Sequence, residues 1–555
     1  MDPVTPKAGI SSARSLGVTI LALAVAGALV VWLAWRAGGY FPTSYLPAGA
    51  VACGTVALLL VAAPPGWRFS VHALVALGAL AAFTAWTGLS SNWAPDPSLA
   101  VQAMERDVLY LALFALGLLA AGSGRYARAI PWVVVVVATI IVGGGLLSRL
   151  EPDLVSAPAA NALADGRLGH PLGYWNAYGG LAAMLTVLTC GLAGDPRTPV
   201  LARALAAGLS TLAFVAMYFS LSRGAWLALM VGAVVLVVAA ARRGSLLLTA
   251  GVIVGASVIA VSRLQAYPQL TGSTADSPHT GAGHAYAGQL AVIVLLVVAV
   301  QFAIASGRAS ERLMDAMGRV ARPLATGIAA FLAVGAVIGY AVHARAVEGR
   351  AANGLNDSAG FVSRQWRDFM RPAVQAQSGT SRLVTSKGTR SDLYRVAIDG
   401  FEAHPLRGDG AGGFEVRWAR SRDVQEDVRN AHSLELETLG ELGLVGLLLL
   451  CSFLGAVVVA AVRSRLRPGG LGRGQTAAVS AGFAVWLAHS FVDWDWQMPA
   501  VTGCALLLAA PLLPHGRVRR RRSARADRDE IEPSEPYPWS RVGAWREASE
   551  TSARG

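Results

Sequence analysis

Apolar runs about twenty residues long recur along almost the whole of this 555-residue chain. An α-helix of about 20 apolar residues spans the hydrocarbon core of a bilayer. Only 15% of the residues are charged, whereas soluble proteins carry about 25%. The pattern therefore predicts an all-α polytopic membrane protein with about fourteen transmembrane helices. The expected spans are 16–35, 45–64, 70–89, 107–122, 129–148, 174–193, 204–221, 225–241, 245–262, 287–306, 323–343, 443–462, 474–492 and 498–513.

The distribution of arginine predicts the orientation of these helices. If the N-terminus lies in the cytoplasm, the arginines concentrate in the cytoplasmic loops, as the positive-inside rule requires. This explains the formal net charge of +13 without a nucleic-acid partner, and none is predicted. Both termini are then cytoplasmic, the protein lies in the cytoplasmic (inner) membrane, and the polar segment 344–442 faces outward. The arginines assigned to short outer loops are only Arg36, Arg106, Arg149, Arg167, Arg223 and Arg263.

These patterns divide the chain into four parts. Residues 1–203 hold the first six spans, and residues 204–446 hold a core of spans seven to eleven with the loop 344–442. Residues 443–515 hold the last three spans. The tail 516–555 is basic and then mixed in charge, which predicts a disordered segment held at anionic membrane lipids.

The polar stretch 389–446 interrupts the apolar pattern. Apolar residues in Ser391–Phe401 recur on one helix face, and a second helix is expected to begin near Asn430 as its N-cap. Between them, the glycine cluster that contains Gly408 and Gly410 matches GxGxxG. No strand precedes it, so a dinucleotide site is not predicted. We expect a tight turn that brings the backbone close to another segment.

Three arginines could bind an anionic group near the membrane surface. Arg223 lies in a turn of about three residues between two apolar helices, where a charge is costly without an anionic partner. Arg390 begins the first loop helix, and Arg167 precedes the sixth span. The candidate ligand is a diphosphate, and the alternative for Arg223 is a lipid phosphate.

His432 lies just before the twelfth span, followed by Glu435, Glu437 and Glu441 on the same expected helix. An interfacial histidine is either structural or a base. The carboxylates could pair with loop arginines, since unpaired charges at a membrane entry are costly.

A further set of polar residues lies at the same expected membrane face. Asn176 opens the sixth span, and Asp493, Trp494 and Asp495 precede the last one. Tryptophan is typical of the membrane interface, but the two carboxylates are not. They could bind sugar hydroxyls beside a stacking tryptophan or pair with arginine. The four cysteines lie within apolar runs without metal-site spacing, so no metal and no cofactor is predicted.

Together these segments resemble the O-antigen ligase family. The resemblance rests on SRGAWLAL at 222–229, Arg-x-x-x-Tyr at 390–394, HPLRGDGAGGF at 404–414 and AHSLELETLGELGLVG at 431–446. GRLGHPLGYWNAYG at 166–179 is also similar to the segment that usually precedes the sixth span in this family. The chain departs from the pattern at Ser433, where many members have Asn, and in having more spans.

The resemblance implies a GT-C-like glycosyltransferase bundle with one large extracytoplasmic helical loop. It implies metal-independent, inverting transfer of a glycan from a polyprenyl-diphosphate carrier to an acceptor hydroxyl. Arg223 and Arg390 would hold the diphosphate, and His432 would act as a base or positioning group at the acceptor. Guanidinium groups suit this chemistry because they stabilise the charge that develops on the departing diphosphate.

Other functions remain open from the sequence. A polymerase of lipid-linked repeat units and a protein O-oligosaccharyltransferase share these motifs, so the acceptor can be a glycan, a lipid or a protein. A polysaccharide transporter or flippase would place polar residues near the middle of its spans, whereas here they gather at one face. A non-catalytic scaffold for envelope assembly is the third class.

Overall fold

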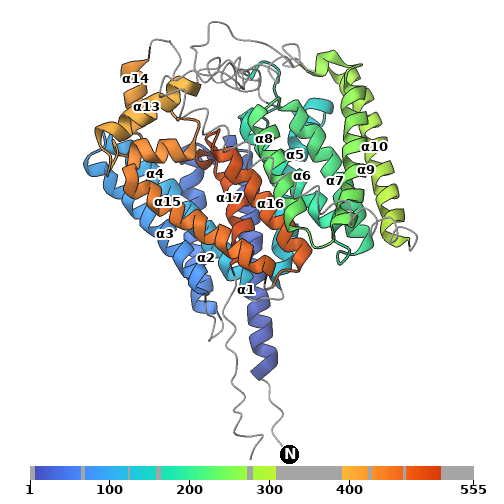
Figure 1. Ribbon diagram of the computed structural model, residues 1–555, viewed down its shortest axis with the longest axis horizontal. Coiled ribbons are helices and arrows are strands. Elements are labelled where there is room, and N and C mark those ends of the chain that lie inside the picture. Colours follow the sequence, from blue (N-terminus) through green and yellow to red (C-terminus); the bar gives the residue numbers. More distant parts are fainter. Residues whose placement is uncertain are drawn as a thin grey trace, which may run out of the picture. The chain divides into compact units, whose positions relative to one another are not determined.

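The computed structural model describes residues 7–63, 69–122, 126–157, 164–271, 279–307, 390–422, 428–466 and 470–513 (Figure 1). Every element of regular secondary structure in these ranges is a helix. The predicted span 323–343, loop residues 344–389 and tail 516–555 lie outside the described residues, and so does the tail's predicted disorder.

The helices overlap the predicted apolar runs, although α4 and α15 begin about ten residues before the predicted starts at 107 and 443. In order, the described helices are α1 (Lys7–Ala34), α2 (Pro42–Ala62), α3 (Val71–Leu89), α4 (Pro97–Ala121), α5 (Ile130–Leu150), α6 (Trp175–Gly194), α7 (Val200–Phe219), α8 (Arg223–Ala239), α9 (Arg243–Leu264), α10 (Thr280–Ser306), α13 (Arg390–Ala403), α14 (Gly413–Ser421), α15 (Leu434–Leu466), α16 (Arg473–Ser490) and α17 (Pro499–Ala509). Short 3₁₀ turns join some of them, at Ala37–Gly39, Ser90–Asn92, Tyr126–Ala129, Pro268–Leu270, Asp495–Gln497 and Ala510–Leu512.

Within the described part of the chain, nine helices are long and apolar enough to cross a membrane, and α8 and α17 are shorter apolar helices. This supports a polytopic membrane protein. The total of fourteen spans and the GT-C-like arrangement stay predictions.

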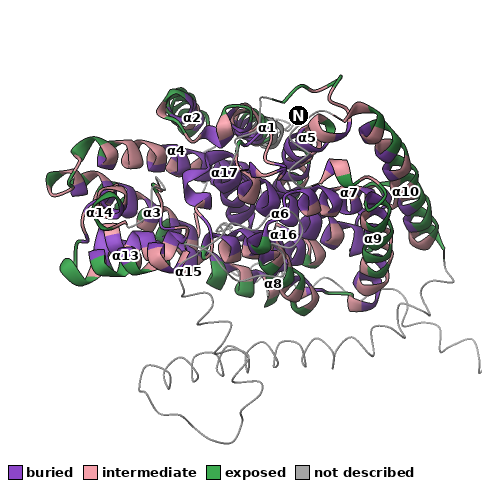
Figure 2. Cartoon of the chain, turned by 90° about the horizontal axis from the view of Figure 1, so that it is seen from above, coloured by how far each residue is buried: buried purple, intermediate pink, exposed green. Residues whose placement is uncertain are grey.

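The buried centre of the bundle is built around α6. The apolar window of α6 is completely buried, whereas only 17% of that of α10 is buried. Figure 2 shows the same contrast between α6, α16 and α17 and the outward sides of α9 and α10. α6 packs against α7, α8 and α16. Small residues permit this close approach: a Cβ at Gly191 would lie 2.7 Å from the Cβ of Ala478.

The loop that follows α13 is fastened to a break in α15. Gly443 has φ 65° and ψ −164°, so α15 consists of two helical segments that meet there. The break frees backbone groups for the glycine loop: Leu444 N–H donates to the Pro405 carbonyl at 2.9 Å, and Gly410 N–H donates to the Glu441 carbonyl at 2.7 Å. Gly408 and Gly410 have positive φ, and a Cβ at either would clash with backbone atoms of Glu441 or Ala94.

Three local expectations differ from the structure. The helix expected near Asn430 begins at Leu434, so Asn430 is not its N-cap. The stretch after the glycine loop, for which no helix was predicted, contains the amphipathic helix α14. Arg223 is the first residue of α8 rather than the centre of a turn, because the turn ends at the capping residue Ser222, whose hydroxyl accepts from Ala225 N–H.

Candidate active site

Arg390 and Asp493 form the central ion pair of the site. Arg390 is the first residue of α13, and its Nη2 lies 2.8 Å from Oδ2 of Asp493, which precedes the short turn before α17. The Asp493 side chain is fully buried, whereas 30% of the Arg390 side chain is exposed. Burial by itself raises the pKa of Asp493, but the charge of Arg390 holds it below its usual range. A fixed carboxylate therefore orients a guanidinium that still reaches the surface.

Tyr174 and Asn176 complete a chain of hydrogen bonds to Asp493. The Tyr174 hydroxyl donates to Oδ1 of Asp493 at 2.8 Å and accepts from the Asn176 amide at 2.6 Å. Burial, with the Asp493 charge, keeps the pKa of Tyr174 well above its usual value, so the phenol remains a donor. The Trp494 ring stacks on Tyr174 with centroids 4.4 Å apart. Three segments distant in sequence thus meet at Asp493.

His432 lies beside this network in a strained backbone conformation. Its φ is +56°, which is rare for a residue with a side chain, and its ring meets Trp494 edge-on at 6.3 Å. Nδ1 lies 3.0 Å from the Asn430 carbonyl oxygen. Since a carbonyl can only accept, the proton of the neutral ring lies on Nδ1, which leaves Nε2 as the basic nitrogen. Burial lowers the pKa of His432, and Arg390 adds to this effect, although the charge of Asp493 opposes it. The ring is therefore neutral near pH 7.

Glu437 and Glu441 hold the backbone around His432 and the glycine loop. Glu437 accepts from Ala431 N–H at 2.7 Å and from the Gln497 side chain. Glu441 accepts from Phe414 N–H at 3.1 Å. In the described part of the chain neither forms an ion pair with arginine; the loop arginines between 344 and 389 lie outside the described residues. The two carboxylates instead accept hydrogen bonds from backbone N–H groups, which are costly when they are buried and unpaired.

Arg223 begins α8 next to the segment that leads to Asp493. The following residue, Gly224, packs against His489 and Val492 of α16 and its C-terminal end, with a Cβ there only 3.1–3.2 Å from each. Arg223 itself is exposed. Leu221, just before it, has φ +48°, so the turn is strained as it is at His432. An exposed arginine therefore begins a helix whose second residue is tightly packed.

Asp495 lies deeper than a sugar-binding group would. It is 1% exposed and accepts from Nδ1 of the fully buried His489 at 2.6 Å. Among the residues described, no group of three or more His, Cys, Asp or Glu side chains could hold a metal ion.

A comparison with known protein families matches residues 208–451 to the O-antigen ligase family model. The chain contains an O-antigen ligase domain. The match covers Arg223, Arg390, the glycine loop and His432. No curated protein matches the chain. The family and the apolar helices together support a membrane protein that ligates glycans in polysaccharide biosynthesis.

The O-antigen ligase domain does not include every residue that lines this site. Tyr174, Asn176 and Asp493 fall outside 208–451 but are joined to Arg390 by the contacts above. Arg167 precedes Tyr174 in the segment that leads to α6, and its guanidinium lies 3.8 Å from the centre of the Trp175 ring.

Two contributors were not among the sequence candidates. Tyr174 was visible as one of two tyrosines that flank Asn176, and His489 as the residue six positions before Asp495. Neither spacing indicates a contact, because it depends on how α6 and α16 pack.

Proposed function

We propose that the protein transfers a glycan from a polyprenyl-diphosphate carrier to an acceptor hydroxyl at the outer face of the cytoplasmic membrane. The observation that carries this proposal is the exposed edge of Arg390, fixed by buried Asp493, beside a neutral His432 with a basic Nε2. A cation at the leaving group and a base at the nucleophile are the two groups that such a transfer needs.

In the proposed reaction the acceptor oxygen attacks the anomeric carbon from the face opposite the diphosphate, which inverts its configuration. His432 Nε2 takes the proton of the acceptor hydroxyl. The bond from the anomeric carbon to the diphosphate oxygen breaks, and the electron pair leaves with the diphosphate.

Arg390 and Arg223 would stabilise the charge on the leaving diphosphate. The helix start at Arg223 adds backbone N–H groups and the positive end of the α8 dipole. Trp494 and Asn176 would contact the sugars or the acceptor, with Trp494 stacking on a ring. Asp493 and Asp495 are too buried for that role, and we assign them to positioning Arg390 and His489.

The experiment is transfer by purified protein in liposomes that contain a lipid-linked glycan and a candidate acceptor. His432→Ala, Arg390→Ala and Arg223→Ala should each reduce covalent transfer by about 10²-fold or more. Arg395→Ala is the matched control, because Arg395 lies on α13 but is 60% exposed and pairs with Asp392 on its own helix. Full transfer by all three variants would refute the proposal, and glycan movement without a new covalent bond would favour a transporter.

The acceptor can be identified in cells that lack the protein. Full-length lipid-linked chains that accumulate without surface glycan would indicate a ligase. Single repeat units would indicate a polymerase, and loss of glycan from proteins alone would indicate a protein O-oligosaccharyltransferase.

A further inference from the structure

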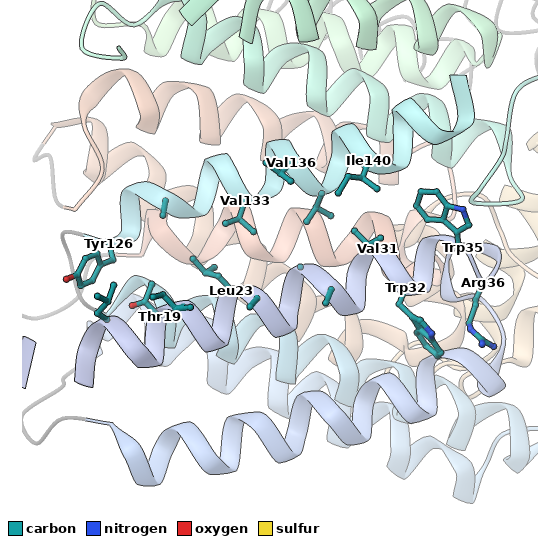
Figure 3. A pocket seen from close by; sticks show the side chains of 17 residues that line it. Thr19, Leu23, Val31, Trp32, Trp35, Arg36, Tyr126, Val133, Val136 and Ile140 are labelled. Carbon is teal, nitrogen blue, oxygen red and sulfur yellow. The ribbon is translucent and has the colours of Figure 1, made fainter. Parts of the chain in front are cut away.

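We propose that a groove between α1 and α5 holds the polyprenyl chain of the donor, an inference that rests on the proposed function. Figure 3 shows this groove, with Thr19 and Tyr126 at one end and Trp32, Trp35 and Arg36 at the other. Its volume is about 1200 Å³. Leu16 to Arg36 spans about 30 Å at 1.5 Å per residue, which matches the hydrocarbon thickness of a bilayer.

The walls of the groove fit an apolar chain. The α1 side presents Ala24, Gly27 and Ala28, whose small side chains leave the space open, and the α5 side presents valines and isoleucine. Thr19 and Tyr126 carry hydroxyls at the far end of the groove, and the Thr19 hydroxyl already donates to the Ser15 carbonyl at 3.0 Å. The volume exceeds the roughly 300–1,000 Å³ typical of pockets for compact small ligands. A long hydrocarbon is therefore the class of ligand that the groove suits.

The end of the groove near the candidate active site carries a positive charge. Arg36 is exposed, and its guanidinium lies 4.5 Å from the centre of the Trp32 ring. The exposed Trp35 ring covers Gly144 of α5, where a Cβ would lie 2.8 Å from it. A cation on a tryptophan ring at a membrane boundary complements an anionic phosphate joined to an apolar chain.

The charged end of the groove is continuous with the site. After Arg36 the chain turns through Gly38, which packs against Met498, and reaches Tyr40. The Tyr40 ring meets Trp494 at 5.4 Å, and Trp494 stacks on Tyr174 of the Asp493 network. Trp35 also meets His170 edge-on at 6.5 Å, in the segment that leads to Tyr174. A polyprenyl chain in the groove thus delivers its diphosphate to the face that carries Arg390.

The first test obstructs the groove and varies the length of the donor lipid. Ala28→Trp should raise the KM for a full-length polyprenyl donor by about tenfold or more while leaving transfer from a short-prenyl analogue unchanged. Ala291→Trp is the matched control, an exposed alanine on α10 outside the groove. Equal KM values for Ala28→Trp and wild type would overturn the inference. A loss with both donors would also overturn it, since that indicates a structural defect rather than a chain-binding site.

The second test measures binding without transfer, so that it stands even if the proposed function fails. A photoreactive amino acid replaces Ala24 or, as control, Ala291 in the full chain in liposomes. The probes are a labelled polyprenyl diphosphate and a labelled phospholipid. Selective cross-linking of the polyprenyl probe at position 24, resistant to excess phospholipid, supports the inference. Equal labelling by both probes, equal labelling at both positions, or a cross-link to the protein's own chain would overturn it.

Discussion

Asp493 accepts hydrogen bonds from Arg390, Tyr174 and its neighbour's backbone, Trp494 N–H. A fully buried carboxylate is costly unless it is paired and hydrogen-bonded, so its charge and the guanidinium of Arg390 depend on each other. At the residue scale, the site consists of the Arg390 guanidinium, which Asp493 positions, and the His432 ring, which hydrogen-bonds to the Asn430 carbonyl.

Asp493→Asn should reduce transfer by on the order of 10²-fold, because asparagine can still accept from Tyr174 but no longer holds the Arg390 guanidinium in place. The double variant Arg390→Ala/Asp493→Asn should be no slower than Arg390→Ala alone if Asp493 acts through Arg390. Rates are measured in liposomes alongside thermal stability. Additive losses in the double variant would contradict a positioning role.

Transfer should depend on pH through His432. Its pKa lies below the usual 6.5 chiefly because of burial, and only the neutral ring accepts a proton. Activity should therefore rise with pH through a midpoint below 6.5 and then reach a plateau. The pH profile of kcat/KM measures this midpoint, and His432→Gln should abolish that limb. A rising limb that persists in the variant would assign it to another group.

At the element scale, the break in α15 is what brings the loop helices to the membrane helices. The Asp409 carboxylate links the loop to α14 through two contacts with Arg417, at 2.6 and 2.8 Å. The same loop donates backbone hydrogen bonds to the residues around Gly443. α13, which carries Arg390, packs against α15 as well.

Gly443→Ala should destabilise the protein by about 2 kcal/mol or more, because its φ and ψ are accessible essentially only to glycine and a Cβ would clash with the Leu406 carbonyl. Gly455→Ala on the same helix is the control, since a Cβ there meets nothing within 4 Å. It should be neutral or slightly stabilising. Thermal unfolding in detergent measures both, and equal stability of the two variants would contradict the account of the break.

At the scale of the whole molecule, the proposed topology places α13 and α14 outside the cytoplasm. The same topology would place the α15–α16 connection on the opposite side of the membrane. Both assignments rest on the arginine distribution alone.

In a cysteine-free background, Ser421→Cys should react with a membrane-impermeant maleimide in intact cells, and Gly470→Cys should react only after lysis. Ser421 is exposed at the end of α14, so a lack of reaction there is informative. The reverse pattern would show that the protein has the opposite orientation in the membrane and would place transfer on the cytoplasmic side.

The sequence by itself determined the helical membrane architecture and most of the charged candidates. A span must satisfy its backbone hydrogen bonds within its own helix and present apolar side chains to lipid, and both requirements are local. For the same reason α13 could be predicted from its periodicity within one residue of its start. Arg223 could be chosen because a charge next to an apolar run is itself informative, whereas the roles of Arg390 and His432 came from the family resemblance.

Only the tertiary structure decided which of these residues act together. Arg390 and Asp493 are separated by 103 positions and Tyr174 and Asp493 by 319, so their pairing depends on how α6, α13 and α16 pack. Local patterns likewise did not show that Asp495 is buried or that Glu437 and Glu441 accept from backbone N–H groups. They also did not show the groove between α1 and α5. Each depends on where small residues let distant helices approach and on where they leave space.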